Sequence, residues 1–198
     1  MPYSATHKQE TRERIVEAAR ILFNRSGFEG ITIDMVMEAA GLTRGGFYNH
    51  FDNKESLYAE AVSSFLMGRG AEWREEAGVD PSDPSTEGAR RMVASYLSSE
   101  HLGDLDGQCP MIALPSDVAR AGAEVQASYA ELLSAMVGLF ENSLRSNGTS
   151  LALSKRKARA LAALCVGGMV LARTLPESDL AEEVRAAART TANELLRT

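Results

Sequence analysis

The chain has 198 residues, 44% of them hydrophobic and 24% charged, and a formal net charge of -6 at pH 7. This length and apolar content can bury a core, as one large domain or two small ones, without metal or disulfide support. The acidic balance argues against a protein that coats nucleic acid non-specifically, because such binding depends on positive charge. A local DNA-reading face stays possible, since specific contacts need only a few well-placed donors.

The two cysteines, Cys109 and Cys165, show no spacing typical of a metal site or a disulfide framework. The first residues lack the basic start and apolar run of a signal peptide. The longest nearly apolar run, residues 160–172, is too short to cross a bilayer as a helix. We therefore expect a cytoplasmic protein without membrane contact, metal or cofactor.

Two helices are predicted in the first forty residues. Apolar side chains recur at three- and four-residue spacing from Ile15 onward, and Ser26-Gly27 supplies a stop. Thr32 is a good N-cap for a short second helix, and Gly41 ends that helix after about two turns.

A third helix is predicted from Thr43 to about His50. Asp52 and Glu55 then have the spacing of a capping box, with Asp52 as the cap. We expect a longer fourth helix to follow, to continue through Trp73, and to act as the lever between two domains.

The remainder predicts helices separated by polar loops, with no alternation of polar and apolar residues long enough for a sheet. The expected helices are residues 87–101, a proline-broken segment near 115, 123–145, 154–175 and 179–196. The predicted fold class is all-α with about nine helices. An N-terminal domain of three helices spans residues 1–52, and a larger helical domain spans 53–198.

The connection Gly41-Leu42-Thr43 between the second and third helices is typical of a helix-turn-helix. The third helix contains Gly45 and Gly46, each of which costs roughly 1 kcal/mol relative to alanine in a helix interior. Glycines at these positions would allow the backbone to approach a base edge or a phosphate closely.

The aromatic residues of the third helix predict which side faces DNA. Phe47 and Phe51 are four residues apart and are expected to face the core. The outer face is then left to Tyr48, Asn49 and His50.

Lys54 lies in the first turn of the next helix, where free backbone N–H groups favour an anion such as a phosphate. It belongs to a pattern of seven residue types, Thr-x-Gly-x-x-Tyr-x-His-Phe-x-x-Lys-x-x-Leu, from Thr43 to Leu57. This pattern resembles the signature of the TetR family of repressors. The resemblance covers residues 9–60 closely and the rest only as a pattern of helices.

The resemblance implies a homodimer that binds double-stranded DNA at a palindromic operator and responds to a small-molecule effector. The phosphate contacts that it implies come from Thr32, Thr43, Tyr48, His50 and Lys54. The base contacts that it implies come from Arg44, Gly45, Gly46 and Asn49. Arg44 is the expected reader of guanine, because its guanidinium donates two hydrogen bonds to O6 and N7.

The last two helices predict a dimer interface, where Gly167-Gly168 would let another helix come near. The predicted interface residues are Leu161, Leu164, Cys165, Gly168, Ala172, Leu180, Val184, Ala188 and Leu195. Burial of this stripe within one subunit is the alternative.

The middle helices resemble the family in layout, in which they enclose a ligand pocket. The candidate lining residues are Met92, Tyr96, Met111, Leu114, Tyr129, Met136 and Phe140, with plain core as the alternative. Cys109 lies in a polar loop before a proline-broken helix. Partial exposure and a lowered thiol pKa would suit a sensor of oxidants or electrophiles, whereas a small buried hydrophobe is the alternative.

These features favour a repressor released from its operator by an inducer. Cys109 with His101 is the one conceivable nucleophile pair, and the sequence shows no phosphate loop or Ser/His/Asp set, so no enzymatic activity is expected. An activator of the same architecture and a DNA-binding protein without a ligand stay open.

Overall fold

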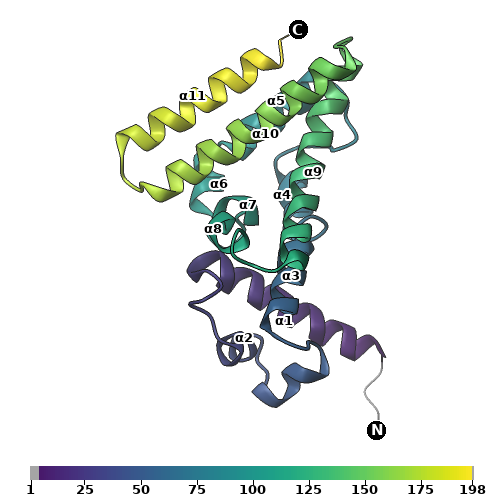
Figure 1. Cartoon of the computed structure of the whole chain (residues 1–198), viewed down its shortest axis with the longest axis vertical. Helices are drawn as coiled ribbons and strands as arrows, with labels where there is room; N and C mark the ends of the chain where they lie inside the picture. The colour runs from purple at the N-terminus through teal and green to yellow at the C-terminus, as the bar shows by residue number, and fades with distance from the viewer. Residues whose placement is uncertain (1–4, 198) are drawn as a thin grey trace.

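The computed structural model describes residues 5–197, which form eleven α-helices, one 3-10 helix and no strand (Figure 1). The predicted all-α fold class is confirmed. The helices outnumber the nine expected because two predicted helices are interrupted and the proline-broken segment forms two short ones. No helix among the described residues is long and apolar enough to cross a membrane.

The N-terminal helices follow the prediction. Helix α1 spans Ala5–Ser26 and α2 spans Ile33–Ala39. Thr32 caps α2, and its hydroxyl accepts a hydrogen bond from the Met35 amide at 3.2 Å. Gly41 ends the helix with a φ of +67°, a conformation that glycine adopts without steric cost.

The third helix and the start of the fourth differ from the prediction. The third is the 3-10 helix η1, Arg44–Asn49, rather than an α-helix. The capping box that begins α3, Lys54–Ser64, is formed by Asn53 and Ser56, so the prediction of Asp52 with Glu55 is wrong. Asn53 already has the extended backbone of a cap, which places the box one residue later.

The long fourth helix expected through Trp73 is wrong, because the chain breaks between α3 and α4, Arg69–Glu76. Gly68 precedes α4, and Gly70 lies so close to the preceding turn that an added Cβ would be 2.5 Å from the Phe65 carbonyl oxygen. The segment therefore turns where a continuous helix was predicted.

The rest of the chain forms the larger helical domain. Its helices are α5 (Thr86–Tyr96), α6 (Ser99–Gly103), α7 (Pro110–Ala113), α8 (Pro115–Val118), α9 (Ala123–Ser146), α10 (Leu151–Thr174) and α11 (Asp179–Leu195). Helix α3 packs against both α1 and α9 and so joins the two parts. The boundary near residue 52 stays a prediction.

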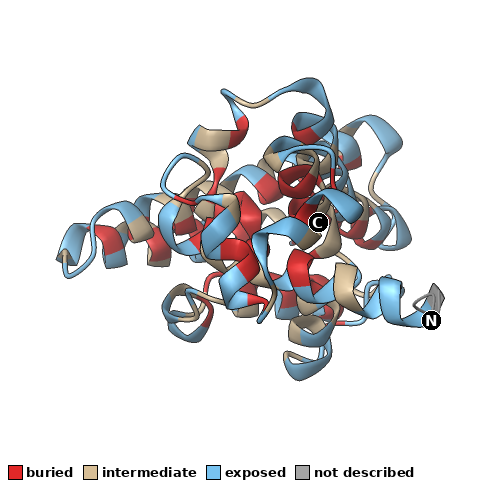
Figure 2. Ribbon diagram, turned by 90° about the horizontal axis from the view of Figure 1, so that it is seen from below, coloured by how far each residue is buried: buried red, intermediate tan, exposed pale blue. Residues whose placement is uncertain are grey.

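The two ends of the molecule differ in what they present. Helices α10 and α11 pack side by side at the end opposite α2 and η1 (Figure 1). Seen from below, buried residues gather toward the middle of the molecule and exposed residues surround them (Figure 2). The helix-turn-helix is thus free to meet another molecule.

Candidate DNA interface and ligand cavity

The 3-10 helix η1 separates a buried side from an exposed one. Phe47 and Phe51 are buried, with their ring centroids 5.7 Å apart, as predicted. Tyr48 is 61% exposed, and its ring is nearly perpendicular to that of Phe47, with the two centroids 5.2 Å apart. Asn49 is also exposed. The side of η1 predicted to face DNA is therefore open to solvent.

The two glycines of η1 have space around them. An added Cβ at Gly45 would meet no atom within 4 Å, and one at Gly46 would meet the Met37 Cε at 3.5 Å. Packing within the chain therefore does not require a glycine at either position. This favours the prediction that the missing side chains admit a partner.

Arg44, the predicted guanine reader, forms an ion pair within its own domain. Its Nη1 lies 2.7 Å from Oδ2 of Asp34 on α2, and both side chains are exposed. An exposed pair of this kind contributes about 0–1 kcal/mol. Arg44 can exchange this partner for a base edge at little cost.

The predicted phosphate contacts are not equally free. Thr43 is at the N-cap of η1, but its side chain makes no capping hydrogen bond. The Lys54 ammonium donates to the Phe28 carbonyl oxygen and lies 4.0 Å from the centroid of the Phe28 ring. Burial lowers the pKa of Lys54. Lys54 therefore has a structural role that the sequence did not suggest, and its phosphate contact stays a prediction.

His50 is half-buried at the end of η1. Its carbonyl oxygen accepts a hydrogen bond from Arg12, which also pairs with Glu60 of α3. Burial, followed by the charges of Lys8 and Arg12, lowers the pKa of the imidazole. The ring is therefore kept neutral, and it can donate one hydrogen bond.

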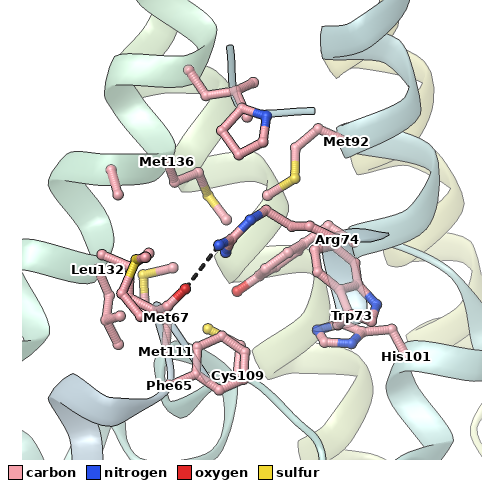
Figure 3. A pocket seen from close by; sticks show the side chains of 15 residues that line it. Phe65, Met67, Trp73, Arg74, Met92, His101, Cys109, Met111, Leu132 and Met136 are labelled. Atoms are coloured by element: carbon pink, nitrogen blue, oxygen red, sulfur yellow. Dashed lines mark hydrogen bonds between the residues drawn. The ribbon is translucent and has the colours of Figure 1, made fainter. Parts of the chain in front are cut away.

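A cavity of about 320 Å³ lies within the larger domain, bounded by α4, α5, α7, α9 and the turn between α3 and α4 (Figure 3). Four of the predicted pocket residues line it: Met92, Tyr96, Met111 and Met136. Trp73, Arg74 and His101 also line it and were missed, because they come from segments whose packing is not local.

Three predicted pocket residues do not line this cavity, so those predictions are wrong. Leu114 and Phe140 are buried in the core, and Leu114 borders a small gap beside α1 and α3. Tyr129 donates from its hydroxyl to the Met111 carbonyl oxygen at 3.2 Å. The helical stripes that carry these residues turn them toward other helices.

Polar groups in the cavity wall lack partners. The two ring nitrogens of His101 are buried without a hydrogen-bond partner among the described residues, and the buried hydroxyl of Tyr96 has only the Cys109 thiol as a partner. The His101 ring lies 4.8 Å from the Trp73 ring and 5.1 Å from the Tyr96 ring, centroid to centroid. Burial lowers the pKa of His101 to about 4, so its ring is neutral near pH 7.

Comparison with known proteins identifies the N-terminal part. Residues 15–61 match the family described as bacterial regulatory proteins, tetR family. The HTH-type transcriptional regulator LmrA of Bacillus subtilis (strain 168) is 25% identical over 173 residues, which cover 85% of this chain and 89% of LmrA. The N-terminal part of the chain, residues 15–61, therefore belongs to the TetR family of bacterial regulatory proteins. Other curated proteins match over shorter stretches of 60 to 78 residues, about a third of their own length.

Solved structures show that a known fold extends through the larger domain of the chain. A TetR transcriptional regulator from Legionella pneumophila has a TM-score of 0.72 at 20% identity, covering 96% of this chain and 99% of that one. The reduced form of Escherichia coli NemR has a TM-score of 0.71 at 17% identity, covering 91% and 96%. At these identities the likeness concerns the fold alone.

Both thiols of the chain are buried. Cys109 is 2% exposed, and burial raises its pKa to about 11. The expectation of a partly exposed thiol with a lowered pKa is therefore wrong, because the loop folds inward and places Cys109 in the cavity wall. Cys165 is fully buried in α10, as expected for an inert core residue.

The predicted dimer stripe is divided between two faces. Its buried members pack within the regulator's own subunit, so their assignment to the interface is wrong: Leu161, Cys165, Gly168, Ala172 and Ala188. An added Cβ at Gly168 would be 2.9 Å from the Ala188 Cβ, so small residues let α10 and α11 pack closely. Leu164, Val184 and Leu195 are half-buried and Leu180 is exposed.

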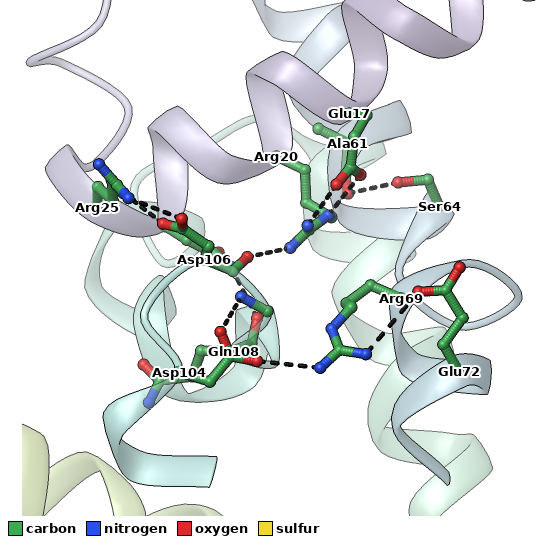
Figure 4. A network of polar contacts seen from close by, with 12 residues as sticks. Glu17, Arg20, Arg25, Ala61, Ser64, Arg69, Glu72, Asp104, Asp106 and Gln108 are labelled. Atoms are coloured by element: carbon green, nitrogen blue, oxygen red, sulfur yellow. Dashed lines mark hydrogen bonds and ion pairs between the residues drawn. The ribbon is translucent and has the colours of Figure 1, made fainter. Parts of the chain in front are cut away.

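The loop 104–109 of the regulator connects the cavity wall to α1 (Figure 4). Asp106 pairs with Arg25 of α1, and its carbonyl oxygen accepts from Arg20. The Gln108 carbonyl oxygen accepts from Asn24 of α1 at 2.7 Å, and its side chain accepts from Arg173 of α10. Sequence patterns carried no signal for this network.

Proposed function

We propose that this regulator is a repressor that binds a palindromic operator as a homodimer and leaves it when a small molecule fills the cavity. One observation carries the proposal: the loop that contributes Cys109 to the cavity wall also bonds to α1, the helix on which the helix-turn-helix packs.

DNA contact is assigned to the exposed side of the helix-turn-helix. Arg44 and Asn49 read bases, while the backbone at Gly45 and Gly46 approaches the groove. The phosphate contacts are Thr32, Thr43, Tyr48, His50 and Lys54. The open space at Gly45 and the exchangeable pair of Arg44 support this assignment.

A single helix-turn-helix reads too short a sequence, and a two-fold dimer doubles it over half-sites about 34 Å apart. We assign the dimer contact to the exposed side of α10 and α11. That side carries exposed apolar residues, among them Leu171 and Leu180, which water would otherwise cover.

Release would follow from a difference in affinity between two states of the regulator. An inducer can weaken DNA binding only by as much as it prefers the state in which the two recognition helices are wrongly spaced. Loop 104–109 is the connection through which a filled cavity would shift α1. The buried amide of Gln108 supports this role, since it bonds to the carbonyl oxygens of His101 and Leu102.

An electrophile or oxidant that modifies Cys109 is the second candidate inducer, because the thiol lines the cavity. A related fold, that of NemR, is described in a reduced form. Burial nevertheless keeps the Cys109 thiol protonated, and the thiolate is the reactive form. We therefore favour reversible binding of an inducer.

The test uses the purified full-length protein and the DNA that flanks its own coding region. We expect one site to be protected, with two related half-sites, and transcription from that promoter in vitro to fall when the protein is added. A rise in transcription would identify an activator and overturn the repressor assignment. Release of the DNA by quinone or peroxide that a Cys109→Ser substitution abolishes would favour the electrophile instead.

A further inference from the structure

Arg74 brings a positive charge into the cavity. It lies on α4, and its guanidinium points into the space between Met92 and Met136 (Figure 3). The surroundings are mainly thioether, aromatic and aliphatic groups. Arg74 is half-buried, and a cation in such surroundings loses part of its hydration without an equivalent gain.

No carboxylate in the described part of the chain, residues 5–197, pairs with this charge. Among the described residues, Arg74 forms no ion pair, and its one hydrogen bond runs from Nη2 to the Leu66 carbonyl oxygen at 2.8 Å. Glu72 and Glu76 of the same helix pair with Arg69 instead. Burial lowers the pKa of Arg74, with only the Cys109 thiol acting in the other direction.

The guanidinium therefore has N–H donors without an acceptor on the side that faces the cavity. Arginine has five N–H donors in a planar fork, and the carbonyl oxygen of Leu66 takes one of them. The neutral His101 ring, which lies beside the Tyr96 ring, adds a buried donor without a partner among the described residues. These groups suit an anionic oxygen acceptor inside an otherwise apolar space.

We propose that the cavity binds a small molecule with an apolar body and one anionic group such as a carboxylate, and that Arg74 pairs with this group. The inference rests on the proposed ligand role of the cavity and specifies the chemistry of that ligand. The exposed side chain of Met67, at 82%, and that of Pro81 mark the side from which the ligand enters.

The probes are decanoate, decan-1-ol and decylammonium, which share one alkyl chain and differ in the charge of the head group. Their dissociation constants are measured by calorimetry with the full-length protein near pH 7. A charge-assisted hydrogen bond of ordinary strength gives decanoate a preference of roughly 10- to 100-fold over decan-1-ol. Decylammonium should bind more weakly than both.

The variant Arg74→Gln should abolish the preference for decanoate and leave decan-1-ol binding unchanged or stronger. Arg74→Lys, which keeps the charge but loses the fork, should retain part of the preference. Arg90→Gln removes an exposed positive charge from α5 and should change none of the three affinities.

Thermal unfolding without probe separates this role from a structural one. Removing a poorly solvated charge should leave the melting temperature of Arg74→Gln equal to or above that of the wild type. A lower melting temperature together with an unchanged preference for decanoate would make Arg74 a structural residue and overturn the inference. Equal binding of decanoate and decan-1-ol, or binding of none of the probes, would also overturn it.

A parallel measurement of operator binding keeps the inference separate from the proposed function. If decanoate binds through Arg74 but leaves operator affinity unchanged, the inference stands and ligand-induced release fails. If decan-1-ol releases the operator as well as decanoate does, induced release stands and the anionic specificity fails.

Discussion

Gly41 and Gly45 lie four residues apart in the helix-turn-helix and serve different purposes. Gly41 has a φ of +67°, so its lack of a side chain is a backbone requirement of the turn. Gly45 has an ordinary φ and nothing within 4 Å of an added Cβ. The fold therefore needs the first glycine, while the second is free to serve DNA binding.

The substitution Gly45→Ala should leave the melting temperature of the protein unchanged and weaken operator binding by about tenfold or more, because the methyl group holds the backbone away from the groove. Fluorescence anisotropy with operator DNA measures the effect. Gly138→Ala is the control: it also points into open space, but on α9, and it should leave DNA affinity unchanged. Wild-type affinity in Gly45→Ala would show that close approach at this position is unnecessary.

His101 predicts a pH dependence of stability. Its pKa falls from an ordinary value of about 6.5 to about 4 through burial, so the unfolded chain binds a proton in this range while the folded chain does not. The neutral His101 ring contributes fully to stability above pH 6.5. As the pH falls toward 4 this contribution is lost, and the free energy of unfolding decreases by about 3 kcal/mol at most.

Urea unfolding at pH 7 and pH 4.5 checks this expectation in wild type and in His101→Phe, which keeps an aromatic ring between Trp73 and Tyr96. Part of the acid destabilisation comes from other groups and remains in both proteins. The wild type should lose about 2–3 kcal/mol more than the variant. Equal losses would show that His101 is solvated in solution.

The sequence predicts burial or exposure for residues whose position depends on their own helix alone. Tyr48 and Phe47 fall on opposite sides of one short helix, so their spacing alone separates core from surface. Trp73, Arg74 and His101 meet in the cavity only because α4 and α6 pack together, and no periodicity within either helix encodes that. Cys109 illustrates the same limit, since a polar loop conceals that it turns inward.

At the scale of elements, the break between α3 and α4 replaces the single lever that a continuous helix would have provided. The chain turns at Gly68 and Gly70, and this turn supplies Phe65, Leu66 and Met67 to the cavity. The two glycines were a sequence signal for this break, but a helix can contain either glycine at a modest cost in free energy. We therefore expect transmission to the DNA-binding end to involve loop 104–109 as well as α3.

The substitution Gln108→Ala tests this connection. It removes the acceptor of Arg173 and the bonds to the cavity wall, and an unsatisfied buried donor costs about 1–3 kcal/mol. We expect lower stability and a smaller change in operator affinity on adding an inducer. Operator titrations without and with inducer measure the ratio of the two operator affinities.

The control for this experiment is Gln126→Ala, an exposed glutamine of α9 that bonds only to nearby carbonyl oxygens. It should keep the wild-type ratio. A Gln108→Ala protein that is folded and retains the full ratio would show that α3 alone carries the signal.

For the whole molecule, the prediction concerns assembly. The substitutions Leu171→Glu and Leu180→Glu each place a charge on the exposed side of α10 or α11. Burying an unpaired charge is costly, so we expect a monomer in sedimentation experiments and the loss of operator binding, since one half-site is too weak. Helical content should be unchanged.

Leu133→Glu is the matched control, because Leu133 is an exposed leucine of α9 outside the proposed contact. It should remain dimeric. A dimer in both α10 and α11 variants would place the contact elsewhere.

The sequence established the fold class and the two-part organisation because helical periodicity and capping are local. It did not reveal which side of α10 faces the same subunit. Small residues such as Gly168 and Ala188 suit a close helix pair within a chain and between chains equally well. Only the position of α11 decides between the two.

Because both cysteines are buried, the rate at which a reagent alkylates Cys109 can report how often the cavity opens. A thiol reagent in solution can reach Cys109 only while the cavity is open, so in a Cys165→Ser protein the alkylation rate counts opening events. An inducer that fills the cavity should slow alkylation in proportion to its occupancy. Inducers could then be ranked by a colour reaction before the operator is known.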